Sequence, residues 1–408
     1  MPILSLVDES PLHTVAIVAA AIALAWGCGR AVRRFGQPPV IGELIAGIAL
    51  GPSVFGALWP ELSVKLVSPA VTAAIGYLAS AAILVFMFLV GLELDTSLLR
   101  RHAAGVLRIA GFSLLVPFTL GSILALALYP SWHGVVANKT AFVLFGGTAM
   151  SITAMPVLTR ILVDLHMLTT RIGTVAIGCA AIDDLVAWTM LGFVVSVTHG
   201  ESNPAAAMGA TSAYVGGMLL IVRPALAKIV SVRDRRGGRT AWILLVAAVA
   251  ILSGIISERI GIHGVFGALL AGVCVPRRPQ VLEGLDRLLG RFTAPLLPAF
   301  FILIGLRTEI GLVSDATGWI LVLTIIVCAT AGKIGASALA ARGAGFSWRD
   351  ALVIGSLLNT RGLVELVALD IGRQLGILSP ALFAIFVIMT LVTTMATVPL
   401  VKQLTTSK

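Results

Sequence analysis

The chain has 408 residues, of which 58% are hydrophobic and only 12% are charged, and its mean hydropathy is +1.03. A soluble domain carries about 25% charged residues, because a folded globule must cover its outside with polar groups. This composition excludes a soluble enzyme, a disordered chain and a secreted disulfide scaffold. It also disfavours a membrane β-barrel, whose strands alternate in polarity over only about 10 residues. The class that fits is an all-α protein that crosses the membrane many times.

Hydrophobic runs separated by short polar or glycine- and proline-rich connections predict thirteen membrane-spanning helices. In chain order they cover residues 12–31, 39–58, 72–93, 104–128, 141–163, 170–198, 207–228, 241–257, 262–275, 292–306, 317–341, 350–371 and 380–401. The ninth is short for a span, since a helix needs about 20 apolar residues to cross the hydrocarbon. The connections are too short for a separate soluble domain, so residues 1–408 are predicted to form one transmembrane domain.

The basic residues give the predicted orientation of these helices. Of the 29 lysines and arginines, 22 fall on one side of the predicted spans, 5 on the other, and 2 lie inside helices. The positive-inside rule puts the richer side in the cytoplasm, with the N-terminus outside and the C-terminus cytoplasmic, as an odd number of spans requires. The net charge of +10 is therefore a topology signal, and no nucleic-acid partner is expected. Residues 1–14 lack a basic stretch, so no cleaved signal peptide is expected; the plasma (inner) membrane is the predicted location.

The helix order predicts an inverted repeat. Helices one to six and eight to thirteen form two sets of six, and because six is even the second set starts on the opposite side of the membrane. The fifth helix of each set is interrupted, by GGTAMSITAMP at residues 146–156 and by GSLLNTRG at residues 355–362. Proline removes a backbone donor, and glycine and serine weaken a helix. Paired broken helices in matching positions indicate a transporter site near the midplane of the membrane.

Three charges lie in the middle of predicted helices, where an ionisable group costs several kcal/mol unless it is paired or hydrated. Asp183 and Asp184 lie in the sixth helix, and Lys333 lies in the eleventh. Adjacent residues point about 100° apart on a helix, so one lysine cannot satisfy both carboxylates. One aspartate can pair with Lys333, and the other then needs a proton or a cation. The pattern predicts a site that binds either a small monovalent cation or protons, with Asp184 and Asp183 as its ligands.

Other charged residues are expected to be supporting or structural. Arg361 and Glu365 lie four apart in the twelfth helix, so they can pair and cap the ends of half-helices. Glu43, near the start of the second helix, is expected to be a structural or vestibule group. The sequence contains no phosphate-binding loop and no histidine pair at metal spacing, so neither ATP nor another cofactor is predicted. Coupling must therefore come from an ion gradient or from partners.

Seven short motifs can be read along the chain. They are QPPVIGELIAGIALGPS (37–53), FLVGLELD (88–95), SITAMPVLTRIL (151–162), IDD (182–184), FFILIGLR (300–307), GK (332–333) and NTRGLVEL (359–366). As a set and at these spacings, they resemble the monovalent cation:proton antiporter-2 family and, in places, its plant cation/proton exchanger branch. The similarity runs from about residue 34 to residue 401.

The resemblance implies an architecture of the sodium/proton antiporter type and a homodimer with an elevator-like motion. Residues 104–198 and 317–401 would form the moving core that carries the ions. Residues 12–93 and 241–306 would form a scaffold that dimerises, and residues 207–228 a linker helix. Many relatives also carry a long cytoplasmic regulatory region, and gating by nucleotides or redox state through such a region is not expected of this chain.

The resemblance also implies roles for individual residues. Asp184 would be the principal cation and proton carboxylate, Asp183 would pair with Lys333 when no cation is bound, and Thr153 would lie at the helix crossover. The supporting residues of the site are expected to be Ser151, Asn359, Thr360, Arg361, Glu365 and Glu43. Many relatives in the plant branch carry Asn-Asp at positions 183 and 184. The Asp-Asp pair with a core lysine resembles electrogenic exchangers.

Together these expectations point to a secondary active antiporter that exchanges Na⁺ or K⁺ for H⁺ by alternating access and takes part in pH homeostasis. The sequence does not predict an enzyme, because it contains no nucleophile–base pair and no set of metal ligands. Two alternatives stay open: a gated potassium efflux channel of the same architecture, and a symporter for an organic anion on a similar inverted-repeat fold. The choice of ion depends on cavity geometry that the sequence does not contain.

Overall fold

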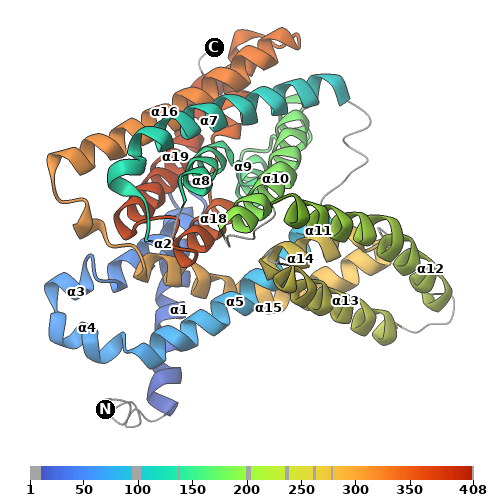
Figure 1. Ribbon diagram of the computed structural model, residues 1–408, viewed down its shortest axis with the longest axis horizontal. Coiled ribbons are helices and arrows are strands. Elements are labelled where there is room, and N and C mark those ends of the chain that lie inside the picture. The colour runs from blue at the N-terminus through green and yellow to red at the C-terminus, as the bar shows by residue number, and fades with distance from the viewer. Residues whose placement is uncertain are drawn as a thin grey trace.

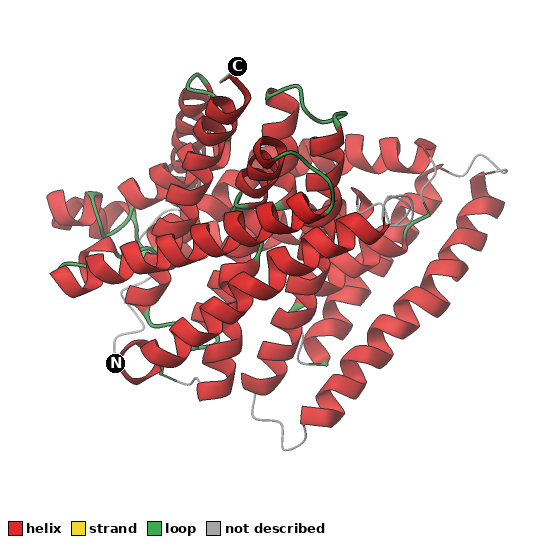
Figure 2. Ribbon diagram, turned by 90° about the horizontal axis from the view of Figure 1, so that it is seen from above, coloured by secondary structure: helices red, strands yellow, loops and turns green. Residues whose placement is uncertain are grey.

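The computed structural model describes residues 11–93, 103–135, 138–198, 204–234, 239–260, 263–276 and 279–406. This part of the chain is helical, with short loops between the helices (Figure 2). The first half contains α1 (Pro11–Arg33), α2 (Pro39–Leu50), α3 (Phe55–Leu58), α4 (Pro60–Leu66), α5 (Pro69–Glu93), α7 (Ala103–Trp132), α8 (Lys139–Ser151), α9 (Met155–Asp164) and α10 (Arg171–Thr198). The second contains α11 (Pro204–Gly217), η1 (Met218–Val222), α12 (Arg223–Asp234), α13 (Arg239–Arg259), α14 (Gly264–Cys274), α15 (Pro279–Leu306), η2 (Ile310–Leu312), α16 (Ala316–Gly343), α17 (Trp348–Leu358), α18 (Leu363–Gln374) and α19 (Pro380–Thr406).

Each of the thirteen predicted spans has a helical counterpart in the described residues. Ten of the described helices are long and apolar enough to cross a membrane, or eleven if the bent pair α17 and α18 counts as one span. The counterpart of the ninth predicted span is α14, an apolar helix of only 11 residues. The all-helical, many-span fold class is therefore confirmed, and the predicted count of thirteen is roughly consistent with it.

Two predicted boundaries are wrong. The tenth helix was expected to begin at residue 292, whereas α15 begins at Pro279 and runs for 28 residues. Arg287 and Arg291 suggested a connection, but arginine is a good helix former where a helix extends beyond the hydrocarbon. The predicted helix 207–228 is part of a longer run from Pro204 to Asp234, which passes through a π-helical turn at η1.

The helices pack in two groups (Figure 1). We define group A as α1, α2, α5, α14 and α15, which pack on one another in the lower part of Figure 1. Group B consists of α7, α8, α9, α10, α16, α17, α18 and α19, which pack on one another in the upper part. The segment from α11 to α12 follows group B in the chain, and α11 contacts α10 while α12 contacts α13.

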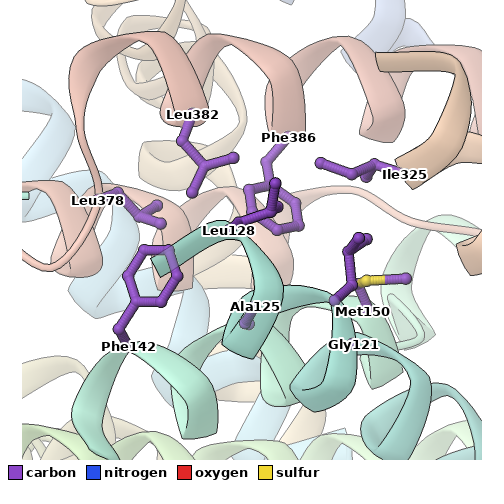
Figure 3. Close-up of a pocket in the computed structure, with 11 residues that line it drawn as sticks. Gly121, Ala125, Leu128, Phe142, Met150, Ile325, Leu378, Leu382 and Phe386 are labelled. Carbon is purple, nitrogen blue, oxygen red and sulfur yellow. The ribbon is translucent and has the colours of Figure 1, made fainter. Parts of the chain in front are cut away.

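Helices α7 and α8 of group B approach closely through small residues. A Cβ atom on Gly146 would lie 2.6 Å from the Cβ of Ala125, and one on Gly147 would lie 2.3 Å from the Ser122 hydroxyl. Small residues allow membrane helices to pack backbone against backbone. A cavity of about 10 Å³ lies beside this contact, lined only by apolar side chains such as Phe142 and Phe386 (Figure 3). It is too small and too apolar to hold a ligand, so it belongs to the packing of the core.

Candidate functional site

Both predicted helix interruptions are present, and they cross each other. Extended residues 152–154 separate α8 from α9, and residues 359–362 separate α17 from α18, which bend by 42° relative to each other. The backbone N–H of Ala154 donates to the carbonyl of Thr360 at 3.0 Å, so the two interruptions are directly joined. The crossing is tight at Gly362, whose φ is +156°, because a Cβ atom there would lie 2.7 Å from a methyl group of Val157.

Lys333 of α16 is fully buried beside this crossing. Its Nζ donates to Asp183 Oδ2 at 2.8 Å, to the backbone carbonyl of Ser113 at 3.1 Å, and to the backbone carbonyl of Ser151. An ammonium group carries three protons, so all of its donors are used. Lys333 therefore pairs with Asp183, the aspartate that the family resemblance implies as its partner.

Asp183 of α10 is the most heavily bonded carboxylate of the site. Its Oδ2 accepts from Lys333, lies 2.6 Å from the Thr153 hydroxyl and lies 3.4 Å from the Ser113 hydroxyl. Thr153 lies in the first interruption, and its hydroxyl is also 2.9 Å from the carbonyl of Leu358, where the second interruption begins. Thr153 therefore connects both broken helices to Asp183, in agreement with its expected place at the crossover.

Asp184 has a different environment, although it is the next residue in α10. Its side chain is fully buried, and neither carboxylate oxygen has a hydrogen-bond partner in the described structure. The N-terminus of α9 at Met155 faces it, and the partial positive charge of a helix N-terminus favours an anion there. A buried carboxylate without a partner costs several kcal/mol. Since the cluster has two carboxylates and one ammonium group, Asp184 needs a proton or a cation.

A second buried charge pair lies at the same crossing. Arg361 donates to Glu365 at 3.0 Å, and both side chains are fully buried. The guanidinium group also donates to the carbonyls of Ala149 and Met150 at 2.8 and 2.7 Å. These carbonyls belong to the last turn of α8, so Arg361 caps that helix where its dipole favours a cation. The predicted i,i+4 pair and its capping role are both present.

The remaining predicted residues divide into two sets. Ser151 contributes its backbone carbonyl to Lys333, while its hydroxyl donates to the Thr148 carbonyl at 2.9 Å. Asn359 and Thr360 lie fully buried in the second interruption, and the amide oxygen of the first and the hydroxyl of the second have no partner in the described structure. These three residues therefore lie at the crossing with the charged cluster.

Glu43 is the exception among the predicted site residues. It lies in α2 of group A, where its side chain packs against Gly29 of α1. The fold therefore does not bring it to the aspartates, and a structural or vestibule place fits its position.

Sequence reasoning missed Ser113. It is fully buried in α7, its carbonyl accepts from Lys333, and its hydroxyl lies against Asp183. Nothing marks it in the sequence, because a serine in an apolar helix usually bonds within its own helix. Its role follows only from the packing of α7 on α16, which the sequence does not contain.

Comparison with known proteins identifies the family of this chain. A sequence profile described as "Sodium/hydrogen exchanger, transmembrane" matches residues 17–403. The chain belongs to this sodium/hydrogen exchanger family. The family is one of transporters, and this chain is an integral membrane protein whose matched relatives are named cation/proton antiporters. The predicted family is confirmed.

Relatives of this chain occur in bacteria and plants. It is 36% identical over 404 residues to the Na(+)/H(+) antiporter NhaS4 of Synechocystis sp., covering 96% of this chain and 98% of that protein. It is 35% identical over 383 residues to Cation/H(+) antiporter 18 of Arabidopsis thaliana, covering 91% of this chain and 46% of the plant protein. This chain thus spans about half the length of that plant relative.

A solved structure has the same fold as this chain. The sodium proton antiporter MjNhaP1 of Methanocaldococcus jannaschii superposes with a TM-score of 0.69 at 14% sequence identity, covering 95% of this chain and 96% of that one. At so low an identity the likeness shows the fold alone, and it confirms the predicted antiporter-type architecture.

Proposed function

We propose that this chain exchanges a monovalent cation, Na⁺ or K⁺, for protons at Asp184. The observation that carries the proposal is the contrast between two neighbouring carboxylates, both fully buried. Asp183 has an ammonium partner, whereas neither oxygen of Asp184 has one. A carboxylate in such a place is stable only with a proton or a cation, and binding one excludes the other. This mutual exclusion is the requirement for antiport.

The residues around Asp184 suggest how a cation is held. Small monovalent cations prefer oxygen ligands such as carboxylates, carbonyls and hydroxyls. The Thr153 hydroxyl, the Asn359 amide oxygen and the Thr360 hydroxyl lie at the crossing, and the latter two have no partner in the described structure. We assign these groups, together with Asp183, as the supporting ligands. A cation that draws Asp183 away leaves the Lys333 ammonium without its carboxylate partner.

This rearrangement makes the exchange electrogenic. When a cation displaces the proton of Asp184 and also promotes release of a proton from Lys333, more than one proton is exchanged for one positive charge. The membrane potential then acts on the exchange, at about 2.3 kcal/mol per elementary charge per 100 mV.

Alternating access requires that one part of the molecule move against another. The buried charge cluster lies entirely in group B, on α7, α10, α16 and the broken helices. We assign residues 104–198 and 317–401 as the moving core, residues 12–93 and 241–306 as the scaffold, and residues 207–228 as the linker. The scaffold is proposed to dimerise with a second copy in the plasma membrane, with the N-terminus outside and the C-terminus cytoplasmic. A channel of the same architecture is not favoured, because the matched relatives are antiporters.

The proposal is tested by transport in proteoliposomes that contain a pH-sensitive dye. Li⁺, Na⁺, K⁺ and Rb⁺ are supplied in turn, and at least one is expected to drive proton movement. Asp184→Asn should abolish that movement, because an amide has no negative charge for a proton or cation to neutralise. Glu61→Gln, which changes an exposed carboxylate of α4, is the matched control and should keep the wild-type rate.

Two results would contradict the proposal. Full activity of Asp184→Asn would show that the ion does not bind there. Current through a planar bilayer without proton coupling would instead support a channel.

A further inference from the structure

Groups A and B are tied together by an ion pair at the end of the molecule where α15 and α18 finish. Arg307 directly follows α15 of group A, and its Nη1 donates to Asp370 Oδ1 in α18 of group B. The other oxygen of Asp370 accepts from Gln374 at 2.8 Å, so both of its oxygens are used. The two side chains are 28% and 10% exposed, which partly shields the pair from water.

A cavity of about 180 Å³ lies next to this ion pair, and both groups line it. Ser80 and Ile83 of α5 and Phe300 of α15 form the wall from group A. Val367 and Ile371 of α18, on the helix that carries Asp370, form the wall from group B. The groups are therefore separated by space rather than interlocked side chains at this level, so one can shift against the other without disrupting a packed core.

The contact between the groups at the opposite end is weaker. The side-chain amide of Gln37, between α1 and α2, donates to the carbonyl of Met395 in α19 at 3.1 Å, in an exposed position. A cavity of about 60 Å³ lies close by, lined by Pro38 of one group and by Ile161 and Val398 of the other. A bond between charged groups is roughly twice as strong as one between neutral groups. The two ends are thus held unequally.

The Arg307–Asp370 pair is connected to the ion site through α18. This helix begins at Leu363, directly after the interruption that contains Asn359 and Thr360. Asp370 lies seven residues further along the helix, which corresponds to about 10 Å at 1.5 Å per residue. When α18 moves with the crossing as one rigid helix while α15 stays in place, Asp370 moves relative to Arg307.

We propose that the Arg307–Asp370 pair is a latch that holds groups A and B in one transport conformation and opens in the other. The latch rests on the proposed function, because it requires the two groups to move during exchange. Removing the Arg307–Asp370 pair favours the conformation that lacks it. The apparent affinity for the cation then changes by different factors when it is measured from the two faces of the membrane. A partly exposed ion pair contributes up to about 1 kcal/mol, equivalent to a population change of about fivefold.

The experiment measures the apparent KM for the cation from each side, using the full chain in right-side-out and in inside-out membrane vesicles. Asp370→Asn and Arg307→Gln are each expected to change the ratio of the two KM values about threefold to fivefold in the same direction. The exchanged pair Arg307→Asp with Asp370→Arg should return the ratio toward the wild-type value. Glu61→Gln, which changes an exposed carboxylate of α4 outside both groups, is the control and should leave the ratio unchanged.

The results separate the latch from other roles. An unchanged ratio of the two KM values in both single variants would overturn the latch. Lower thermal stability together with that unchanged ratio would show that the pair is only a structural tie. Absence of cation-coupled proton movement in the wild-type vesicles would overturn the proposed function instead.

Discussion

Two buried charge clusters lie at the same helix crossing, and they differ in charge balance. The Arg361–Glu365 pair has one cation and one anion, and the guanidinium group also bonds two carbonyls at the end of α8. The cluster of Asp183, Asp184 and Lys333 has two carboxylates for one ammonium group, and Asp184 has no partner in the described structure. Burial alone therefore does not distinguish a structural charge from an exchangeable one. The unbalanced charge makes the distinction.

The largest expected effect concerns the balanced pair and is a loss of stability. Arg361→Met leaves Glu365 and two α8 carbonyls buried without their donor, so unfolding should become easier by about 3–5 kcal/mol, the usual result of removing one partner of a buried pair. Asp184→Asn should leave thermal stability equal or higher, because it removes an uncompensated charge. Thermal unfolding in detergent compares the two variants, with Arg160→Gln as an exposed control worth about 0–1 kcal/mol. Equal losses of thermal stability in Arg361→Met and Asp184→Asn would contradict the distinction between the balanced and the unbalanced charge cluster.

The next effect concerns the voltage dependence of exchange. Lys333→Gln removes the ammonium partner of Asp183, so this variant should also lose stability, but its amide keeps N–H donors for the carbonyls of Ser113 and Ser151. Because this variant has one exchangeable proton fewer, its transport rate should depend less on membrane potential than the wild-type rate. Proteoliposome flux at two imposed potentials measures the difference. Lys333→Arg retains the charge and serves as the control; wild-type voltage dependence in Lys333→Gln would argue against a role of the lysine in charge movement.

The smallest effect concerns Thr153. Thr153→Val keeps the shape of the side chain but removes the hydroxyl that bonds both Asp183 and the Leu358 carbonyl. A hydrogen bond contributes about 1 kcal/mol, so the apparent KM for the cation should rise by about fivefold and the free energy of unfolding should fall by about 1 kcal/mol. Thr153→Ser restores the hydroxyl and should restore the wild-type KM. If both substitutions raise KM equally, altered packing at this position is responsible rather than the loss of the hydroxyl.

Much of the fold could be predicted because hydrophobic length and helix interruption are local properties. Each apolar run has a helix in the structure, and Pro156 marks the first interruption, which ends just before it, whereas Gly146 and Gly147 lie inside α8. The start of α15 was misplaced because charged residues outside the hydrocarbon form helix as readily as apolar ones. Hydropathy detects where a helix lies in the membrane and does not detect where it begins.

By itself, the sequence determined that this protein is an all-helical membrane protein with broken helices and three charges at membrane depth, because apolar runs, helix breakers and the charges inside those runs are local properties of the sequence. Helix periodicity alone left open which aspartate bonds Lys333, and the tertiary structure brings Asp183 to it although the two residues are 150 positions apart in the chain. It also added Ser113 to the site and placed Glu43 in the other group of helices. Helix packing sets the direction in which each side chain points, and adjacent aspartates on one helix acquire different partners for that reason.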